Sequence, residues 1–381
     1  MFKNLRSFDT TQAVILTAHQ VLLLICLPVY FYYYSPSASL LVISFILVYA
    51  TALSITVGYH RLYSHRTFRA NPVIEWFLLF FGSMALQQSV LRWSHDHRIH
   101  HAKVDTDEDP YAITKGFWYA HYLWLLEKPI EFNPKVIPDL LKNKLVVFQD
   151  RYYAAVALAT NLICYLALGF ALGDWVGTLM IAIWARIFTV HHVTWSINSL
   201  AHWWGEKPFS KELSAVDNYI IALISGGEGY HNYHHTFAND YRNGICWYHF
   251  DPSKWIIWTL SKVGLTHGLK TTNAYTIKKK IIVEDKNRLV IQLSTFWKEK
   301  KADVENQVEE LSEKLLKTLS EFTRLKERYK ELKKTKTPPE ITKDFRSQMN
   351  ILGENLKADW QKWSDLYKQI MQTPHSQAAR A

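Results

Sequence analysis

Four apolar segments, each about as long as a membrane-spanning helix, constrain this 381-residue chain more than any other feature. They cover residues 13–34, 38–58, 153–173 and 175–196. A helix needs roughly 20 apolar residues to cross the hydrocarbon core of a bilayer. Because each pair is joined by only a few residues, the segments form two hairpins. Backbone groups in lipid must be satisfied inside the structure, so we expect an all-α membrane protein with about four transmembrane helices.

Charges at the ends of these segments predict how the chain is oriented. The tight connections at 35–39 and 173–175 carry no cation, whereas the opposite ends carry many. By the positive-inside rule, both termini and both large loops face the cytoplasm. The cations are Lys3, Arg6, Arg61, Arg66, Arg69, Lys142, Lys144, Arg151, Lys207 and Lys211.

Two further regions are predicted to be helical outside the spans. Residues 72–91 are apolar but contain Glu75, Gln87 and Gln88, and a span there would separate the two large loops, so we expect an interfacial or half-buried helix. Residues 286–381, beyond a membrane domain of residues 1–285, carry two runs of apolar residues spaced by three or four, separated by "TKTPPE". That pattern predicts a helical hairpin or short coiled coil, which either packs on the main body or binds a partner.

Composition narrows the class of partner and compartment. The net charge of +10 accompanies long apolar runs and an aromatic content of 14%, which favours lipid over nucleic acid. No nucleic-acid recognition motif is present. The three cysteines form no CxxC motif, and so the polar part is expected in a reducing compartment.

Histidines are concentrated in the short stretches "HRLYSH", "HDHRIHH", "NSLAH" and "EGYHNYHH", all at the predicted cytoplasmic side. We expect a cytoplasmic helical cap there, above the spanning helices, that carries most of these histidines. On a helix, residues four apart share a face, so His97 and His101 can bind one centre while His100 faces a second. The H-x-x-H-H spacing recurs at 231–235. The candidate ligands are His60, His65, His97, His100, His101, Asn198, His202, His231, His234 and His235.

About ten nitrogen-rich ligands exceed the four that one zinc ion takes, and they fit two metal ions that each keep an open position. Imidazole suits iron, copper, zinc and nickel alike, so the ligand type leaves the metal open. Neighbouring acids could accept hydrogen bonds from the imidazoles and fix their tautomers. These acids are Glu228, Asp105, Asp107, Asp109 and Asp240.

These stretches, with "TWSINSLAH" and "EGYHNYHHTFANDYRNG", resemble the integral-membrane fatty-acid desaturases, in particular the delta-9 acyl desaturases of the stearoyl-CoA desaturase type, over residues 10–270. The resemblance implies a di-iron enzyme that uses O2 and two electrons to place a cis double bond in a saturated acyl chain. It implies one iron held by His60, His65, His97, His101 and His234, and a second held by His100, His202, His231 and His235, with Asn198 contributing through water. Thr194 and Trp195 match residues that line the family's acyl tunnel.

Two departures from the family's pattern concern the acyl carrier. The stretch "LWLLEKP" places Glu127 before Lys128 where the acyl-CoA enzymes carry basic residues, and His95 stands where they commonly have Arg. Fewer cations weaken phosphate recognition. The carrier is therefore CoA, a carrier protein or a glycerolipid, and we expect Arg92 and Lys128 near its head group.

The sequence also bears on the source of electrons and on two competing functions. Residues 286–381 contain no haem-binding "HPGG", so we expect a separate donor of the cytochrome b5 or ferredoxin type. The competing enzyme is a di-iron membrane lipid hydroxylase, whose product gains an oxygen instead of losing two hydrogens. The competing non-enzyme is a membrane metal-binding or scaffold protein, which would consume no O2.

Overall fold

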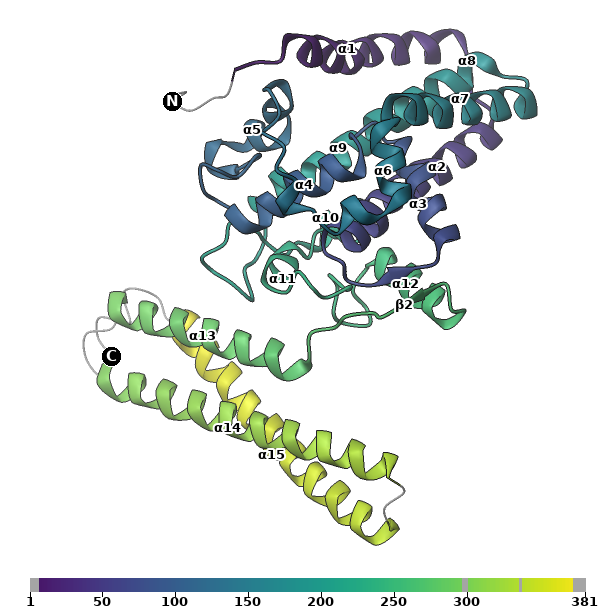
Figure 1. The fold of residues 1–381 in the computed structure, drawn as a ribbon. Coiled ribbons are helices and arrows are strands. Elements are labelled where there is room, and N and C mark those ends of the chain that lie inside the picture. Colours follow the sequence, from purple (N-terminus) through teal and green to yellow (C-terminus); the bar gives the residue numbers. More distant parts are fainter. Residues whose placement is uncertain (1–6, 297–300, 336–337, 373–381) are drawn as a thin grey trace. The chain divides into compact units, whose positions relative to one another are not determined.

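The computed structural model describes residues 7–296, 301–335 and 338–372. The chain divides into two compact units, one built from residues 1–207 and 212–271 and the other from residues 208–211 and 272–381. The first is called the membrane unit below and the second the C-terminal unit. Helices dominate both units (Figure 1).

Among the described residues, four helices are long and apolar enough to cross a membrane: Thr10–Tyr33, Ala38–Ser64, Tyr153–Leu172 and Trp175–His202. This confirms the predicted all-α membrane architecture. Short capped connections create the two hairpins. Ser37 caps α2 (Ala38–Leu53) by accepting from the backbone N–H of Leu40, and Asp174 accepts from Gly177 at the start of the fourth span.

Two of these spans contain π-helical turns, which are wider than α-helical ones and are often found at functional sites. The second span continues from α2 into η1 (Ser54–Ser64), and every residue of η1 is buried. The fourth span begins with α8 (Trp175–Gly177) and η6 (Thr178–Ala185) and then continues as α9 (Arg186–Ser199) and η7 (Leu200–His202). The other two spans are α1 (Thr10–Tyr33) and α7 (Tyr153–Leu172).

The predicted helix over residues 72–91 is interrupted. Helix α3 ends at Ser83 after starting at Pro72, and α4 (Val90–Lys103) begins after a turn. Positive φ angles at Leu86 and Gln88 break the helical path. The polar Gln87–Gln88 pair that argued against a span therefore lies in this turn.

Shorter elements complete the membrane unit and surround the histidine stretches. Strands β1 (Arg69–Ala70) and β2 (Thr266–His267) pair antiparallel, with Arg69 opposite His267. The short α-helices are α5 (Phe117–His121), α6 (Lys144–Arg151), α10 (Tyr219–Ile224), α11 (His231–Thr236) and α12 (Pro252–Lys262). The 3₁₀ turns are η2 (Ile113–Lys115), η3 (Leu123–Leu126), η4 (Pro134–Val136) and η5 (Leu140–Lys142).

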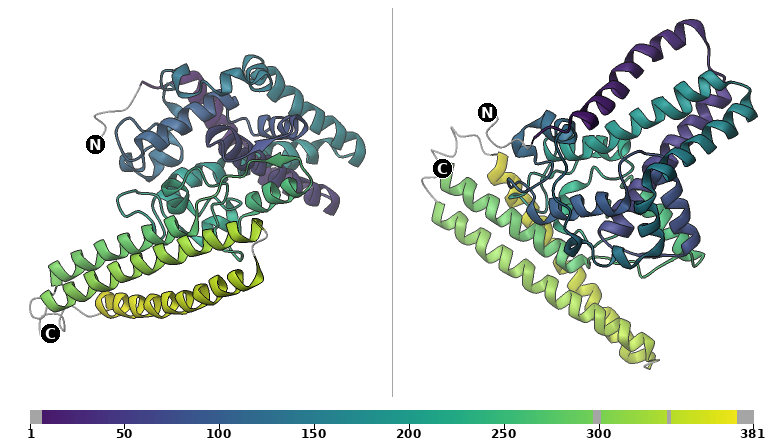
Figure 2. Two further views of the ribbon diagram at one scale, coloured as in Figure 1. Left: turned by 60° about the horizontal axis from the view of Figure 1, so that its bottom comes forward. Right: turned by 45° about the horizontal axis from the view of Figure 1, so that its top comes forward.

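The described residues of the C-terminal unit form three helices, α13 (Ala274–Phe296), α14 (Lys301–Lys334) and α15 (Pro339–Gln372), which run alongside one another (Figure 2). Ile282 and Leu289 of α13 share an apolar core with Val308 of α14 and Trp363 of α15. The sequence-based prediction placed two helices after residue 285. Helix α13 was not predicted, and it starts at Ala274, before residue 285.

Candidate metal centre

Nine histidines of the membrane unit converge in two groups. The first group contains His60, His65, His97, His101 and His234, and the second contains His100, His202, His231 and His235. In each group, every histidine contributes one ring nitrogen, and these nitrogens all lie within 4.8 Å of one another. The grouping of the nine imidazoles is the one that the resemblance implied.

The π-helix explains how His60 and His65 reach the same group. On an α-helix, residues five apart point about 140° away from each other around the axis. The wider π-helical turn of η1 brings the two rings to a centroid distance of 4.8 Å. Histidines five residues apart can therefore share one site on a π-helix, although α-helical periodicity places them on different faces.

The two H-x-x-H-H stretches contribute to both groups in opposite ways. On α4, His97 and His101 join the first group while His100 joins the second. On α11, His231 and His235 join the second group while His234 joins the first. Each helix thus gives an i, i+4 pair to one group and a single imidazole to the other. This interleaving holds the two groups side by side.

Within the groups, the Nε2 atoms face one another at short range. His234 Nε2 lies 3.0 Å from the Nε2 atoms of both His60 and His101, and His231 Nε2 lies 3.1 Å from that of His202 and 3.0 Å from that of His235. A neutral imidazole has one N–H, so the remaining nitrogen lone pairs converge on common points. A cation is the group that such a donor set accommodates.

In His60, His97, His100 and His202, an oxygen atom lies within hydrogen-bond distance of the opposite ring nitrogen, Nδ1. His60 Nδ1 lies 3.1 Å from Glu228 Oε2, and His100 Nδ1 lies 2.9 Å from Asp109 Oδ1. His97 Nδ1 lies 3.2 Å from the hydroxyl of Tyr111. A carboxylate that accepts from Nδ1–H leaves the Nε2 lone pair free for a metal. His100 Nε2 is accordingly buried without a hydrogen-bond partner in the described part of the chain.

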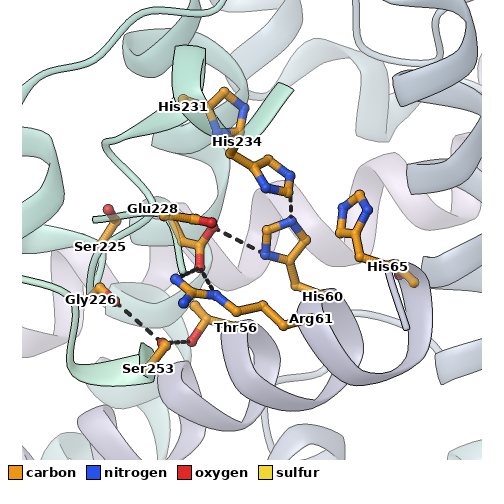
Figure 3. A network of polar contacts seen from close by, with 12 residues as sticks. Thr56, His60, Arg61, His65, Ser225, Gly226, Glu228, His231, His234 and Ser253 are labelled. Atoms are coloured by element: carbon orange, nitrogen blue, oxygen red, sulfur yellow. Dashed lines mark hydrogen bonds and ion pairs between the residues drawn. The ribbon is translucent and has the colours of Figure 1, made fainter. Parts of the chain in front are cut away.

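Behind His60, a buried charge network joins η1 to the loop before α11 (Figure 3). Arg61 donates to Glu228 at 2.9 Å and pairs with Asp251 at 3.0 Å, and all three side chains are about 99% buried or more. Asn243 Nδ2 donates to Glu228 Oε2 at 2.8 Å. Burial alone would raise the pKa of Glu228, but His60 and Arg61 outweigh it and hold that pKa well below its usual range. Glu228 is therefore an anion that orients His60.

Burial also determines the protonation state of the imidazoles. Burial, reinforced by neighbouring imidazoles, holds the pKa values of His97, His101, His234 and His235 well below their usual range. The same causes lower the pKa of His231 to about 3. Neutral imidazole is the metal-binding form, so both groups can bind cations at neutral pH. The donor set, the converging lone pairs and the oriented tautomers all fit two metal ions.

The remaining predicted acids make hydrogen bonds to groups other than imidazoles. Asp105 accepts from the backbone N–H of Ser214 at 2.7 Å, and the hydroxyl of Ser214 lies 2.6 Å from His202 Nδ1. Asp105 thus reaches His202 through Ser214. Asp240 accepts from the hydroxyl of Tyr233 at 2.8 Å and pairs with Arg242. Asp107 accepts from Lys115 through its backbone carbonyl.

A cavity of about 520 Å³ opens beside both histidine groups. Its lining combines His60, His97, His100 and His231 with apolar residues of the spans, among them Ile15, Leu16, Ala52 and Ile55. Thr194, Trp195 and Asn198 line it as well. Gln87 also lines it, and its Nε2 donates to Thr194 Oγ1 at 2.9 Å. An elongated apolar ligand in this cavity would therefore lie next to the metal-binding nitrogens.

The two residues predicted near a head group occupy different settings. Arg92 is mostly buried and pairs with Asp96, a cavity-lining residue, at 3.1 Å. Lys128 is exposed, and its backbone N–H donates to Ser7. Glu127 and His95 are buried: Glu127 accepts from the hydroxyl of Tyr119 at 2.9 Å, and His95 pairs with Asp96 at 2.7 Å.

Several residues of the site were missed by sequence reasoning. Tyr111, Ser214, Arg61 and Trp93 contact histidines or their partners, and Trp93 stacks on His97 at a centroid distance of 4.8 Å. Arg61 and Trp93 stand within or beside histidine stretches, so proximity in sequence could have indicated them. Nothing in the sequence marks Tyr111 or Ser214, which approach only through the fold.

Comparison with known proteins identifies the family. Residues 36–267 match the family model of fatty acid desaturases. The chain is 42% identical over 245 residues to a probable acyl-CoA desaturase of Schizosaccharomyces pombe, covering 62% of this chain and 50% of that protein. It is 40% identical to acyl-CoA desaturase 1 of Saccharomyces cerevisiae, covering 62% and 47%, and 35% identical to a delta(9)-fatty-acid desaturase of Caenorhabditis elegans, covering 60% and 70%. The chain thus spans about half the length of the two yeast relatives. It belongs to the fatty acid desaturase family.

Proposed function

We propose that this membrane protein is an O2-dependent fatty acyl desaturase that introduces a cis double bond, at the delta-9 position, into a saturated acyl chain. The observation that carries the proposal is the arrangement of nine imidazoles in two groups, four of which, His60, His97, His100 and His231, line a largely apolar cavity. The names of the three relatives agree with it. In the balanced reaction, one CH2–CH2 unit, O2, two electrons and two protons give CH=CH and two water molecules.

The metals of the proposed centre are two iron ions. His60, His65, His97, His101 and His234 would hold one, and His100, His202, His231 and His235 would hold the other, with Asn198 contributing from the cavity wall through water. Iron would supply the redox chemistry with O2 that breaking an unactivated C–H bond requires, which zinc lacks.

The chain's own residues perform the positioning. Ile15, Leu16, Ala52 and Ile55 offer an apolar surface to the acyl chain and keep water away from it. Glu228 and Asp109 fix the tautomers of His60 and His100, so that Nε2 faces the metal. Trp93, stacked on His97, prevents that ring from turning. A small displacement of the chain would cost much of the rate, so this rigidity is part of catalysis.

The carrier, the donor and the membrane orientation belong to the same proposal. We infer that CoA carries the acyl chain, since the yeast relatives are named acyl-CoA desaturases. Arg92 and Lys128 are proposed to lie near the head group, and reversing both charges with no change in substrate affinity would refute this. A separate donor of the cytochrome b5 or ferredoxin type would supply two electrons from the cytoplasmic side, where the termini and the active site are proposed to lie.

The test is a fatty-acid profile by gas chromatography–mass spectrometry in a host that lacks its own membrane desaturase but supplies electron carriers. The wild-type protein is compared with His231→Ala, which removes one imidazole of the second group. New cis-9 monounsaturated chains from the wild type alone would support desaturation at the metal centre. Products heavier by one oxygen would instead indicate a hydroxylase. An unchanged profile, with iron bound by the purified protein and a compatible donor added, would contradict both.

A further inference from the structure

A non-helical turn at residues 84–89 forms part of the cavity wall. It separates α3 from α4, and Leu86 and Gln88 in it have φ angles of 54° and 71°. Leu86, Gln87 and Gln88 all line the cavity. Such a turn leaves backbone groups without helical partners, and left-handed φ angles are unfavourable for residues other than glycine. Something outside the turn must therefore hold it.

Side chains from neighbouring helices make those hydrogen bonds. The carbonyl of Met84 accepts from Arg186 Nη1 at 3.1 Å and from Asn161 Nδ2 at 3.4 Å. The carbonyl of Ala85 lies 2.8 Å from His191 Nε2, and the N–H of Gln88 donates to the hydroxyl of Tyr153 at 2.9 Å. The turn is thus fixed by α7 and α9, two of the four spans.

Arg186 stands out among these partners because it is a fully buried cation within a span. Its guanidinium also donates to Thr51 Oγ1 at 3.1 Å, to the side-chain oxygen of Asn161 and to the carbonyl of Ala182 at 2.9 Å. In the described part of the chain, no carboxylate lies within ion-pair distance of it. A charge buried in this way is costly, so a residue of this kind has a function by default.

We propose that Arg186 is a positioning residue that fixes the turn at 84–89 and so determines which carbon–carbon bond of the acyl chain lies beside the histidine groups. This inference rests on the proposed desaturase function. The link runs from Arg186 to Met84, along the turn to Gln87, and from Gln87 Nε2 to Thr194 Oγ1, two turns further along α9 and also on the cavity wall. Leu86 and Gln87 are the turn's contact surface for the chain.

Lysine cannot replace arginine here, because the planar guanidinium reaches acceptors on four elements, and a single ammonium on a flexible stem cannot. Arg186→Lys therefore keeps the buried charge and releases the turn. Thr189→Val is the matched control, since Thr189 lies on the same helix, and its exposed hydroxyl donates only to Ala185 of its own helix. Asn161→Ala, which removes one partner of both Arg186 and Met84, serves if Arg186→Lys does not fold.

The first measurement is the position of the double bond in products of the iron-loaded protein in nanodiscs, together with kcat, KM, iron content and unfolding temperature. For Arg186→Lys we expect kcat to fall by about 10- to 100-fold, as for a displacement of about 1 Å. Positional isomers should increase at least about threefold, while iron content stays at the wild-type value. A wild-type kcat and isomer pattern, or a loss of iron in proportion to the loss of activity, would overturn the proposal.

The second measurement does not depend on turnover. A nitroxide is attached to Leu86→Cys, a partly exposed position, in a background with Cys26, Cys164 and Cys246 replaced by Ser. Electron paramagnetic resonance should show an immobilised label with Arg186 and with Thr189→Val, and a mobile label with Arg186→Lys. Equal mobility in all three would overturn the positioning role. If the wild type makes no unsaturated product, the desaturase function fails, and the label alone decides whether Arg186 holds the turn.

Discussion

Glu228→Gln is the substitution that most sharply tests how the first histidine group is organised. Glu228 accepts from Arg61 at 2.9 Å and from Asn243 at 2.8 Å, and it lies 3.1 Å from His60 Nδ1. Glutamine keeps the shape, removes the charge and turns one acceptor into a donor. With the amide oxygen kept toward Arg61, the new donor takes the place of Oε2 and faces both His60 Nδ1 and Asn243 Nδ2, so His60 loses the partner that fixes its tautomer.

The expected losses of unfolding free energy and of metal affinity depend on the contacts that remain in the Glu228→Gln protein. Breaking a buried ion pair by removing one partner costs about 3–5 kcal/mol. Arg61 keeps Asp251 at 3.0 Å, so we expect a smaller loss of unfolding free energy, about 1–3 kcal/mol, as for one unsatisfied buried group. Replacing a carboxylate that orients a metal-bound imidazole lowers metal affinity by about 10- to 100-fold. That corresponds to about 1.4–2.8 kcal/mol.

The assay is a metal titration against a competing chelator in detergent or nanodiscs, with bound metal counted by inductively coupled plasma mass spectrometry. We expect one of two ions to be released at lower chelator concentration, because the second group keeps Asp109. Glu108→Gln is the control, since Glu108 is exposed and pairs only with Lys103 on the surface. Wild-type affinity for both ions in folded Glu228→Gln protein would show that Glu228 does not orient His60 for metal binding.

Three further predictions address the second group, the cavity and pH. Asp109→Asn removes the anion 2.9 Å from His100 Nδ1. Chelator titration should show that the affinity for the ion of the second group falls by about 10- to 100-fold. If the ion of the first group were lost instead, as expected for Glu228→Gln, the two groups would not be separate sites. Ala52→Trp fills part of the 520 Å³ cavity, and we expect acyl turnover to fall more than about tenfold with bound metal unchanged; unaltered turnover in folded protein would show that the chain binds elsewhere. Burial raises the pKa of Asp217 to about 7, although the backbone N–H groups of Tyr233 and Asn232 counteract it. The folded-state pKa exceeds the ordinary value of 3.8, so the contribution of Asp217 to the free energy of unfolding depends on pH. That contribution is fully present below about pH 4 and is lost as the pH rises through 7. Asp217→Asn should remove this dependence, at most about 4 kcal/mol between pH 4 and 8 in chemical unfolding, and an unchanged pH profile would disprove it.

Much of the architecture was predictable because it follows from length and periodicity. The four spans follow from apolar length, and the division of His97, His100 and His101 between two groups follows from α-helical geometry. The same geometry fails for His60 and His65, since only a π-helix brings residues five apart together. No intrinsic preference in "SITVGYHRLYS" marks a π-helix, so its packing environment must select it.

Contacts between distant segments account for the rest. The helix predicted over 72–91 breaks at residues 84–89 because Arg186 and His191, about 100 residues later, supply hydrogen bonds to its backbone. Asp240 accepts from the hydroxyl of Tyr233 and pairs with Arg242, contacts that its closeness in sequence to the imidazoles does not reveal. Tyr111 and Ser214 reach the rings through loops whose path periodicity does not determine.

We propose that the two histidine groups each hold one iron ion and act as a single centre. The most direct measurement is the number of iron ions per chain in anaerobically reconstituted protein, combined with anomalous scattering at the iron edge to locate them. We expect two ions, one within each group of imidazoles. One ion per chain, or two ions outside these groups, would contradict it.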